Sequence, residues 1–274
     1  MTLQELNRLA KKHAGNSGIA ESDYWFILTA ILNRTRSQIL LNPDQEVAAG
    51  EIELVIQAFN RLEKSEPPQY IVGKACFRNL ELVVSPAVLI PRPETELLID
   101  IVLPMLKPNA RILEIGTGSG AIAIALKSER PDFTLVATEL ADGAIEVAKI
   151  NAAKHRVNID LRKADLFPEF DFKFACLISN PPYISSAEME SLEARVKEHE
   201  PKLALWGGKD GLLYYKRILA EAVNYIQKEG FIAFEHGYLQ KAAIKMIAAQ
   251  FGWTHAETYP DLSGKDRFSV FIQK

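Results

Sequence analysis

Apolar residues recur along the chain in two different patterns. Up to about residue 70 they fall at helical spacing, as at Tyr24, Ile27, Leu28 and Ile31, and this predicts a bundle of helices. Further on, short runs of branched apolar residues alternate with helical stretches, which is typical of a mostly parallel sheet. The predicted strands cover residues 111–115, 134–139, 159–164, 174–179, 230–235, 254–259 and 267–272. The pattern therefore predicts an α/β fold with a seven-stranded, Rossmann-like sheet after an N-terminal helical bundle.

Breaks in the pattern predict where the parts of the chain meet. Pro67 and the proline after it end the last helix of the bundle, and a strand-like stretch around Arg78 and Asn79 predicts a β-hairpin linker. The predicted domains are residues 1–72 for the helical bundle, 73–90 for the linker and 91–274 for the α/β domain. Within the bundle, Ser22 is the predicted cap of the second helix, and Pro43 is predicted to open another.

Composition narrows the class of protein. The 274 residues are 48% hydrophobic, which is ample for buried cores, yet no apolar stretch approaches the ~20 residues of a membrane helix. The 32 basic residues against 35 acidic ones form no dense basic run, so a protein partner is favoured over nucleic acid. Cys76 and Cys176 offer neither a disulfide framework nor metal-ligand spacing with the five histidines. We expect a cytoplasmic protein with reduced thiols and no metal, without an export signal at Met1–Glu5.

A glycine-rich turn follows the first predicted strand of the sheet. The strand 111–115 leads into Gly116-Thr117-Gly118-Ser119-Gly120, and glycines there let a ligand approach the backbone closely. Such a turn is compatible with NAD, FAD or S-adenosylmethionine. The alternate spacing of the glycines departs from the dinucleotide fingerprint, and Glu114 would repel a pyrophosphate. The turn therefore favours S-adenosylmethionine.

Acidic residues end the next two predicted strands. Glu139 lies 19 residues beyond Gly120, close to the ~20-residue offset at which a carboxylate accepts hydrogen bonds from ribose hydroxyls. Asp165 follows the third strand, where it can accept a hydrogen bond from an adenine amine, with Leu166 against the ring. Either acid alone is typical of a solvated strand end, because carboxylates are mostly exposed. Together, after a glycine turn, they predict a nucleoside pocket.

Asn180-Pro181-Pro182-Tyr183 follows the apolar strand 174–179. This position is the carboxyl end of a predicted parallel strand, where open α/β sheets bind ligands. The two prolines fix the backbone and lack N–H groups, so the carbonyls of Asn180 and Pro181 can face a ligand. An amide, a rigid carbonyl and an aromatic ring suit a planar group that carries an NH2. The competing interpretation is a Pro-Pro turn with Tyr183 as ordinary packing.

Taken together, these residues resemble the class I S-adenosylmethionine-dependent methyltransferases. They are more closely similar to the HemK/PrmC family, the glutamine methyltransferases of peptide chain release factors. The motifs that carry the likeness are Gln69–Gly73, Val88–Glu96, Glu114–Gly120, Asn180–Tyr183, Glu200–Pro201, Gly207–Leu212 and Asp261–Arg267. The stretch from Pro91 to Glu96 is the most discriminating, because methyltransferases acting on DNA amino groups share the Asn180–Tyr183 motif but not this segment. Glu139 stands where the family usually has Asp.

The resemblance implies the ligands and the residues that hold them. S-adenosylmethionine is the expected methyl donor and S-adenosylhomocysteine the product. The expected donor-binding residues are Glu114, Gly116, Thr117, Gly118, Ser119, Gly120, Glu139, Asp165, Leu166 and Asn180. The expected substrate-binding residues are Arg92, Glu94, Asn180, Pro181, Pro182 and Tyr183, of which Asn180, Pro181 and Tyr183 are the catalytic candidates. The alternative for Arg92 and Glu94 is an ion pair with each other at the surface.

The implied reaction is methylation of the glutamine amide in the Gly-Gly-Gln loop of a release factor. The Asn180 oxygen and the Pro181 carbonyl would hold the two amide N–H bonds, Tyr183 would pack on the amide plane, and no strong base is needed. The helical domain would help to hold the release factor, and no stable nucleic-acid or membrane partner is expected. The alternatives are glutamine methylation of a ribosomal protein, amino methylation of adenine in nucleic acid, a non-catalytic adenosine-binding protein and, most weakly, an NAD-dependent oxidoreductase.

Overall fold

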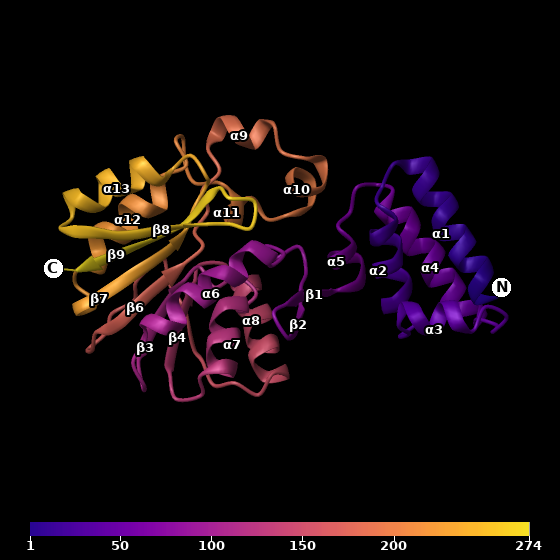
Figure 1. Ribbon diagram of the computed structural model, residues 1–274, viewed down its shortest axis with the longest axis horizontal. Coiled ribbons are helices and arrows are strands. Elements are labelled where there is room, and N and C mark those ends of the chain that lie inside the picture. Colours follow the sequence, from indigo (N-terminus) through magenta and orange to yellow (C-terminus); the bar gives the residue numbers. More distant parts are fainter. Residues whose placement is uncertain (274) are drawn as a thin grey trace. The chain divides into compact units, whose positions relative to one another are not determined.

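The computed structural model describes residues 1–273 and divides into two compact units (Figure 1). The first unit comprises residues 1–74 together with 193–199. The second comprises residues 75–192 and the described chain from residue 200 onward. Among residues 1–273, no helix combines the length and the apolar character needed to cross a bilayer.

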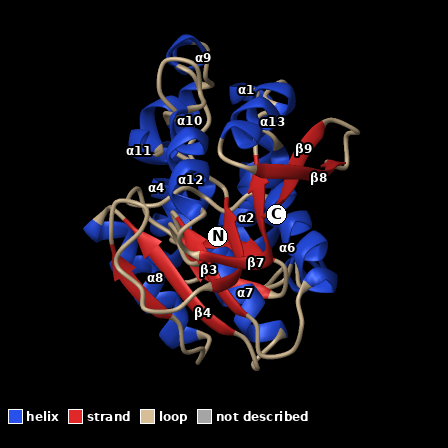
Figure 2. Ribbon diagram, turned by 90° about the vertical axis from the view of Figure 1, so that its left-hand side faces the viewer, coloured by secondary structure: helices blue, strands red, loops and turns tan. Residues whose placement is uncertain are grey.

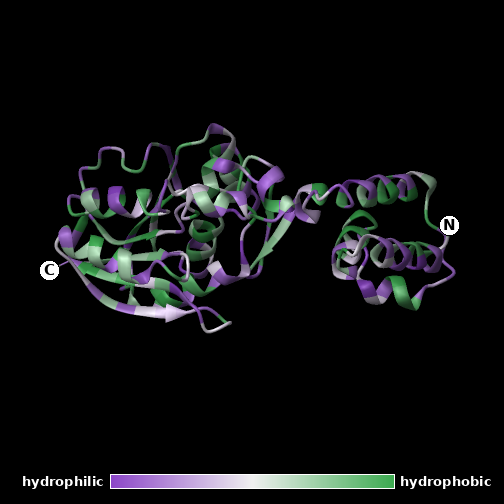
Figure 3. Ribbon diagram, turned by 90° about the horizontal axis from the view of Figure 1, so that it is seen from above, coloured by the Kyte–Doolittle hydropathy of each residue, from purple (hydrophilic) through white to green (hydrophobic). Residues whose placement is uncertain are grey.

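The first unit is built from helices, as the sequence pattern predicts. They are α1 (Leu3–Ser17), α2 (Glu21–Ile31), α3 (Arg36–Leu41), α4 (Ala49–Leu62), α5 (Pro68–Val72) and α10 (Ala194–His199). The buried faces of α1 to α4 meet in one core, in which the rings of Tyr24 and Phe59 lie 4.9 Å apart in an edge-on contact. Hydrophobic and hydrophilic positions alternate along these helices in Figure 3, as expected of helices that bury one face.

Two predicted helix starts in this unit are wrong. α2 has Ala20 as its N-cap, so Ser22 lies inside the helix, where acidic residues of the first turn favour the positive end of the helix dipole. Pro43 lies in the loop between α3 and α4, which begins only at Ala49. Its carbonyl accepts a hydrogen bond from the backbone of Gln4 at 3.0 Å, so Pro43 fixes the start of α1 instead.

The second unit opens with the predicted β-hairpin. β1 (Lys74–Phe77) and β2 (Leu80–Val83) form a two-stranded sheet, and Arg78 adopts the left-handed conformation (φ +51°) at the turn. The side chain of Asn151 on α8 (Asp142–Lys154) is fully buried and bonds both the N–H and the carbonyl of Val83. The same amide donates to the carbonyl of Ser119, so the hairpin is tied to the glycine-rich turn.

The seven-stranded sheet is confirmed, with the strand order β5-β4-β3-β6-β7-β9-β8 (Figure 2). Its strands are β3 (Arg111–Ile115), β4 (Thr134–Glu139), β5 (Asp160–Lys163), β6 (Phe174–Ser179), β7 (Ile226–Glu235), β8 (Trp253–Pro260) and β9 (Asp266–Gln273). The first five run parallel to one another, and β9 runs antiparallel to both β7 and β8.

Helices cover both faces of this sheet. Ile112 on β3 packs with α6 (Glu96–Val102), α7 (Ala121–Glu129) and α8, whereas the next residue, Leu113, packs with α12 (Leu213–Ala222) and α13 (Lys241–Gln250). This alternation is the period-two pattern of a strand that is buried on both faces. The remaining short helices are η1 (Pro93–Thr95), η2 (Leu103–Met105), α9 (Ser186–Glu190) and α11 (Lys202–Leu205).

The order of the strands decides where a ligand can bind. β3 has β4 on one side and β6 on the other, so the chain progression reverses between β3 and β6. Ser179 at the end of β6 donates a hydrogen bond to the carbonyl of Ile115 at the end of β3, at 2.7 Å. Open α/β sheets bind ligands at such a switch point, outside the carboxyl ends of the strands.

Candidate active site

The glycine-rich turn after β3 leaves an open surface at the switch point. Gly116, Gly118 and Gly120 have φ values of +71°, +57° and +84°, a region that side chains other than glycine disfavour. A Cβ atom added to Gly116 or Gly118 would meet nothing within 4 Å, so a ligand can approach the backbone there. At Gly120 it would lie 2.9 Å from Ile124, so this glycine serves the packing of α7.

Two hollows meet beside this turn. The larger is an open cleft of about 820 Å³, a volume that includes the solvent space at its mouth. Of the predicted donor-binding residues, Gly116, Gly118, Glu139, Asp165, Leu166 and Asn180 line it. The smaller cavity, of about 410 Å³, is lined by Glu114, Thr117, Ser119, Gly116, Gly118 and Asn180 among the predicted residues. Gly120 lines neither hollow.

Glu139 ends β4 with its carboxylate fixed by backbone donors. One oxygen accepts from the N–H of Gly118 at 3.0 Å, and the other accepts from Leu140 and Ala141 at 2.8 and 3.0 Å. A carboxylate offers about four acceptor positions, so it can still accept from a ligand hydroxyl. The geometry is that of a preorganised acceptor at the edge of the cleft.

The far end of the cleft combines an acid with apolar walls. Asp165 forms an ion pair with Arg217 on α12, with 2.9 Å between Oδ2 and Nη2. Leu166 has a left-handed backbone (φ +71°), and its carbonyl accepts from the Thr138 hydroxyl at 2.8 Å. This bond holds the apolar side chain of Leu166 at the cleft wall.

Glu114 is a buried acid under the glycine-rich turn. Its Oε2 atom accepts from the Thr117 hydroxyl at 2.7 Å and from the N–H of Ala123 at 3.0 Å. Burial raises the pKa of Glu114 to about 8, against the opposing effect of these two hydrogen bonds. The carboxyl therefore links the turn to the first residues of α7 and is largely protonated at neutral pH.

Asn180 lies where the two hollows meet and lines both. Its Nδ2 donates to the Thr95 hydroxyl at 3.3 Å, and no donor among residues 1–273 is bonded to its side-chain oxygen. Pro181 and Pro182 line the cleft, and none of the described residues donates to the Pro181 carbonyl. Two acceptors, one from a side chain and one from the backbone, are thus available side by side.

Tyr183 lies beside the cleft and is not among the residues that line it. Its ring packs against the apolar cluster between the sheet and α12, and Arg267 is hydrogen-bonded to its hydroxyl. Burial raises the pKa of Tyr183 to about 12, so the phenol is neutral at physiological pH. Its carbonyl accepts from the Gln240 side chain at 2.9 Å, which braces the segment that ends at Tyr183.

Arg92 does not pair with Glu94. Its Nη2 lies 2.5 Å from Oε1 of Glu200, whose side chain is almost fully buried. The other oxygen of Glu200 accepts from the N–H of Ile90 at 3.4 Å. Arg92 lines the smaller cavity, whereas Glu94 is exposed and lines neither hollow. The ion pair fixes the start of the segment from Pro201, which covers part of the cleft.

Similarity to known proteins decides the family. A family model described as the PrmC N-terminal domain matches residues 5–73, and one described as the methyltransferase small domain matches residues 93–203. A release factor glutamine methyltransferase of Streptococcus pneumoniae is 36% identical and aligns over 89% of each chain. One of Bacillus anthracis is 35% identical over 100% of this chain and 99% of its own. The chain belongs to the release factor glutamine methyltransferase family.

Comparison with solved structures shows which fold this chain shares. A methyltransferase from Pyrococcus furiosus matches with a TM-score of 0.56 at 17% identity, covering 82% of this chain and 99% of that one. At that level of identity the likeness shows the fold alone, and it confirms the α/β methyltransferase architecture. Among residues 1–273 no group of three or more His, Cys, Asp or Glu side chains is arranged to hold a metal ion.

Several residues at the site were not predicted from the sequence. Tyr214 and Ile218 on α12 line the cleft, and Arg217 between them pairs with Asp165. Thr95 and Glu235, which neighbour Asn180, were missed as well. Thr95 lies within the motif Val88–Glu96 and Glu235 ends a predicted strand, but no local pattern connects two residues that are 140 positions apart.

Proposed function

We propose that this chain transfers a methyl group from S-adenosylmethionine to the side-chain amide nitrogen of the glutamine in the Gly-Gly-Gln motif of peptide chain release factors. The observation that carries the proposal is the position of Asn180, which lines both hollows. A donor in the cleft and a glutamine side chain in the smaller cavity would meet beside it. The substrate class comes from the relatives, which are named release factor glutamine methyltransferases.

The groups that line the cleft suit the chemistry of the donor. Gly116 and Gly118 leave backbone space for a ligand, Glu139 offers acceptors for ribose hydroxyls, and Asp165 with Leu166 suits an adenine. When bound, S-adenosylmethionine supplies a methyl group that is already activated by a positively charged sulfur. The protein's task is therefore to position the two partners, and positioning contributes up to ~7–11 kcal/mol in well-oriented systems.

Asn180 and Pro181 would act on the substrate amide. The nitrogen of a carboxamide is a poor nucleophile, because its lone pair is delocalised into the carbonyl. The Asn180 oxygen and the Pro181 carbonyl, aimed at the two N–H bonds, would hold the nitrogen and stabilise the positive charge that develops on it. Preorganised dipoles of this kind need no reorganisation during the reaction.

The proton needs no strong base in this scheme. The methylated nitrogen is very acidic before it loses its proton, so water suffices as the acceptor. The neutral phenol of Tyr183, with a pKa of about 12, agrees with a packing role for that side chain. The region that matches the PrmC N-terminal domain, near the predicted domain 1–72, would recognise the substrate protein.

The test compares candidate substrates in parallel. Tritiated methyl transfer to a release factor, a ribosomal protein, DNA and RNA should label the release factor, and mass spectrometry should place the methyl group on the Gly-Gly-Gln glutamine. Asn180→Ala should slow that transfer by roughly 10²–10³, the scale of losing one oriented polar group, while donor binding changes only a few-fold. Asn224→Ala, at an exposed position after α12, is the matched control. Labelling of nucleic acid alone, or normal turnover of Asn180→Ala, would overturn the proposal.

A further inference from the structure

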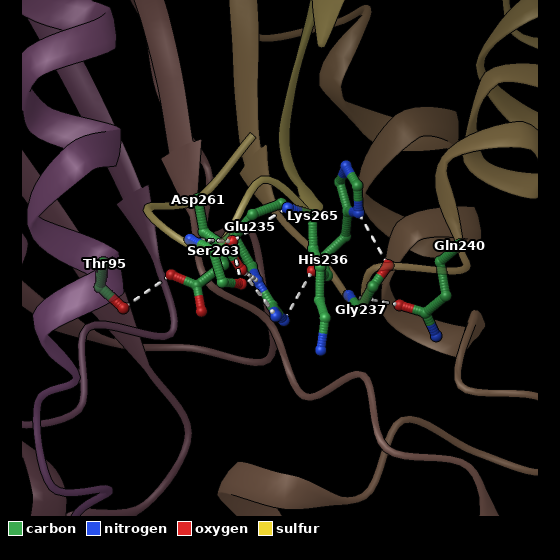
Figure 4. A network of polar contacts seen from close by, with 9 residues as sticks. Thr95, Glu235, His236, Gly237, Gln240, Asp261, Ser263 and Lys265 are labelled. Carbon is green, nitrogen blue, oxygen red and sulfur yellow. Dashed lines mark hydrogen bonds and ion pairs between the residues drawn. The ribbon is translucent and has the colours of Figure 1, made fainter. Parts of the chain in front are cut away.

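The side chain of Asn180 is the first member of a buried hydrogen-bond chain. Its Nδ2 donates to Oγ1 of Thr95 at 3.3 Å, and that hydroxyl donates to Oε2 of Glu235 at 2.6 Å. Thr95 and Glu235 are only 5% and 2% exposed, so water does not compete for these bonds. Figure 4 shows the side chains of Thr95 and Glu235 directed toward each other.

The fold brings the three residues together from distant parts of the sequence. Asn180 follows β6, and Glu235 ends the neighbouring strand β7, in which Phe234 pairs with Ser179. Thr95 comes from η1, 85 positions before Asn180 and 140 before Glu235. The Asn180 amide also favours the ionised form of the Glu235 carboxyl, because it lowers the pKa of that group. Within the described chain, the NH2 group of Asn180 is thus held by the Thr95 hydroxyl.

The donors and acceptors in this series of hydrogen bonds fix the direction in which each bond is donated. An ionised carboxylate can only accept, so Thr95 must give its single hydroxyl proton to Glu235 and accept from Asn180. The Asn180 NH2 group is then held toward Thr95, and the amide oxygen is left for another donor. If Glu235 is protonated, its own O–H can donate to Thr95. The Thr95 hydroxyl is then free to donate to the Asn180 oxygen. The Asn180 side-chain amide can therefore flip, so that its oxygen and nitrogen exchange places.

We propose that Thr95 and Glu235 are positioning residues, which in the ionised state of Glu235 hold the Asn180 oxygen toward the substrate amide. This inference rests on the proposed function, because it assigns a direction to the acceptor that the methylation uses. Glu235 lines neither hollow, and Thr95 lines the smaller cavity next to Asn180. We assign neither residue a contact with the reacting atoms. Both act through the orientation of Asn180.

The charges around Glu235 place this change of state near neutral pH. Burial raises the pKa of Glu235 to about 7. The negative charge of Glu94 on η1 also raises the pKa of Glu235, and the positive charge of Arg267 on β9 lowers it. Arg267 is itself engaged by Asp261, at 3.1 and 3.2 Å, and so does not neutralise Glu235 fully. The phenols of Tyr183 and Tyr215 also face Glu235 and are neutral, because burial raises the pKa of both.

The expected behaviour follows from the sign of that change. Protonation of Glu235 below about pH 7 permits the wrong orientation of Asn180, so kcat should fall as the pH drops from 8 to 6. The dissociation constant of S-adenosylmethionine should change far less over the same range, since Thr95 and Glu235 do not line the donor cleft.

The experiment uses the full chain with a release factor as substrate. Thr95→Val keeps the shape of the side chain and removes the hydroxyl, and it should lower kcat by roughly 10- to 100-fold, the scale of a misplaced reacting group. It should also flatten the dependence of kcat on pH and leave donor affinity within about twofold. Thr95→Ser should restore both the rate and the pH dependence. Glu235→Gln should lower kcat at pH 8 and remove the pH dependence.

Controls separate this role from general damage. Thr134→Val, at the opposite end of β4 from the site, and Glu146→Gln, on the surface of α8, should leave kcat and its pH profile unchanged. Thermal unfolding and donor binding, measured for each variant, identify loss of fold. If Thr95→Val does not fold, Glu235→Gln and the wild-type pH profile still decide.

The outcomes distinguish the inference from the proposed function. A wild-type kcat that is flat from pH 6 to 8, or a Thr95→Val enzyme with the rate and pH profile of the wild type, would overturn the positioning role alone. A wild-type enzyme that labels no release factor would overturn the proposed function, whatever the variants do.

Discussion

Gly207 tests whether the segment from Asn180 to Tyr183 must be held in place for turnover. The glycine follows α11, and its N–H donates to the carbonyl of Ile184 at 2.8 Å. A Cβ atom added at Gly207 would lie 2.6 Å from the Pro182 oxygen and 2.8 Å from Cα of Tyr183. Both neighbours are backbone atoms, which cannot turn aside as a flexible side chain can. Gly207→Ala therefore pushes directly on the proposed catalytic segment.

The size of the effect follows from these distances. Ordinary contacts between such atoms begin near 3.4 Å, so one of the two backbones must move by about 0.6–0.8 Å. A misplacement of ~1 Å at a reacting centre costs up to ~10²-fold in rate. We expect kcat to fall by about 10- to 100-fold, or about 1.4–2.7 kcal/mol of transition-state stabilisation. The crowding should also cost about 1–3 kcal/mol of stability, which corresponds to a fall of about 2–10 °C in Tm.

The assay measures kcat with a release factor, the dissociation constant of S-adenosylmethionine by calorimetry, and Tm for each variant. Donor binding should stay within about threefold, because the groups proposed to hold the donor lie on the glycine-rich turn and at the ends of β4 and β5. Gly230→Ala is the matched control for crowding. Its Cβ would lie 2.6 Å from Ile226 and 2.9 Å from the carbonyl of Ala175, near the start of β6 and away from the site. It should lower Tm and leave kcat unchanged.

A second control is the same substitution at a glycine that has no close neighbours. Gly15→Ala in α1 meets nothing within 4 Å and should be neutral or slightly stabilising. If Gly207→Ala turns over within twofold of the wild type while Gly230→Ala lowers Tm as expected, the reasoning is refuted. The position of the Asn180–Tyr183 segment would then not depend on its contact with Gly207.

Two further predictions concern the donor cleft and the buried acid beneath the glycine-rich turn. Asp165→Ala should weaken binding of S-adenosylmethionine by about tenfold, the loss of one hydrogen bond to a charged group, whereas Asp160→Ala at the other end of β5 should not. Calorimetry measures both, and an unchanged affinity of Asp165→Ala would place the adenine elsewhere. Glu114→Gln should become progressively more stable than the wild type as the pH rises from 5 to 8. The folded wild type keeps a proton up to the raised pKa of about 8, which the unfolded chain has already released, so its stability falls over that range. Urea unfolding at pH 5 and pH 8 measures the difference in unfolding free energy between the two proteins. A difference that is the same at both pH values would show that Glu114 is already ionised in the folded state at pH 5.

Most of the sheet could be predicted because its strands are short apolar runs. The bounds of β3, β4 and β6 match the prediction, and those of β7 do not. β7 begins at Ile226 rather than at residue 230, since Ile226 pairs with Phe174 before an exposed polar stretch that carries no strand pattern. Helix starts in the first unit failed for a similar reason. The serine at position 22 suggests a cap, but α2 begins at Glu21 with Ala20 as its N-cap, and Ala20 has no side chain that could signal a cap.

The candidate site also contains residues that a local sequence pattern identifies and residues that it does not. The glycine-rich turn, Glu139, Asp165 and the Asn180–Tyr183 segment each follow a predicted strand, so a local pattern could identify them. The groups that orient them could not be identified. The Arg92–Glu200 pair spans 108 positions and the Thr95–Glu235 bond 140, and no periodicity connects residues so far apart. Arg217 carries no local signal either, because a basic residue on a helix is ordinarily solvated.

The order of the strands explains why the donor side was easier to predict than the acceptor side. The proposed donor-binding residues follow β3, β4 and β5, which lie next to one another in the sheet in their order along the chain. Local motifs at successive strand ends therefore converge without further information. The acceptor side depends on β6 lying next to β3 and on β7 lying next to β6, and strand patterns do not fix that order. With β6 beside β5 instead, Asn180 would lie near Asp165, and the same motifs would present the amide acceptor to the adenine end of the cleft. The proposed reaction thus depends on the switch point between β3 and β6, where Ser179 is bonded to Ile115.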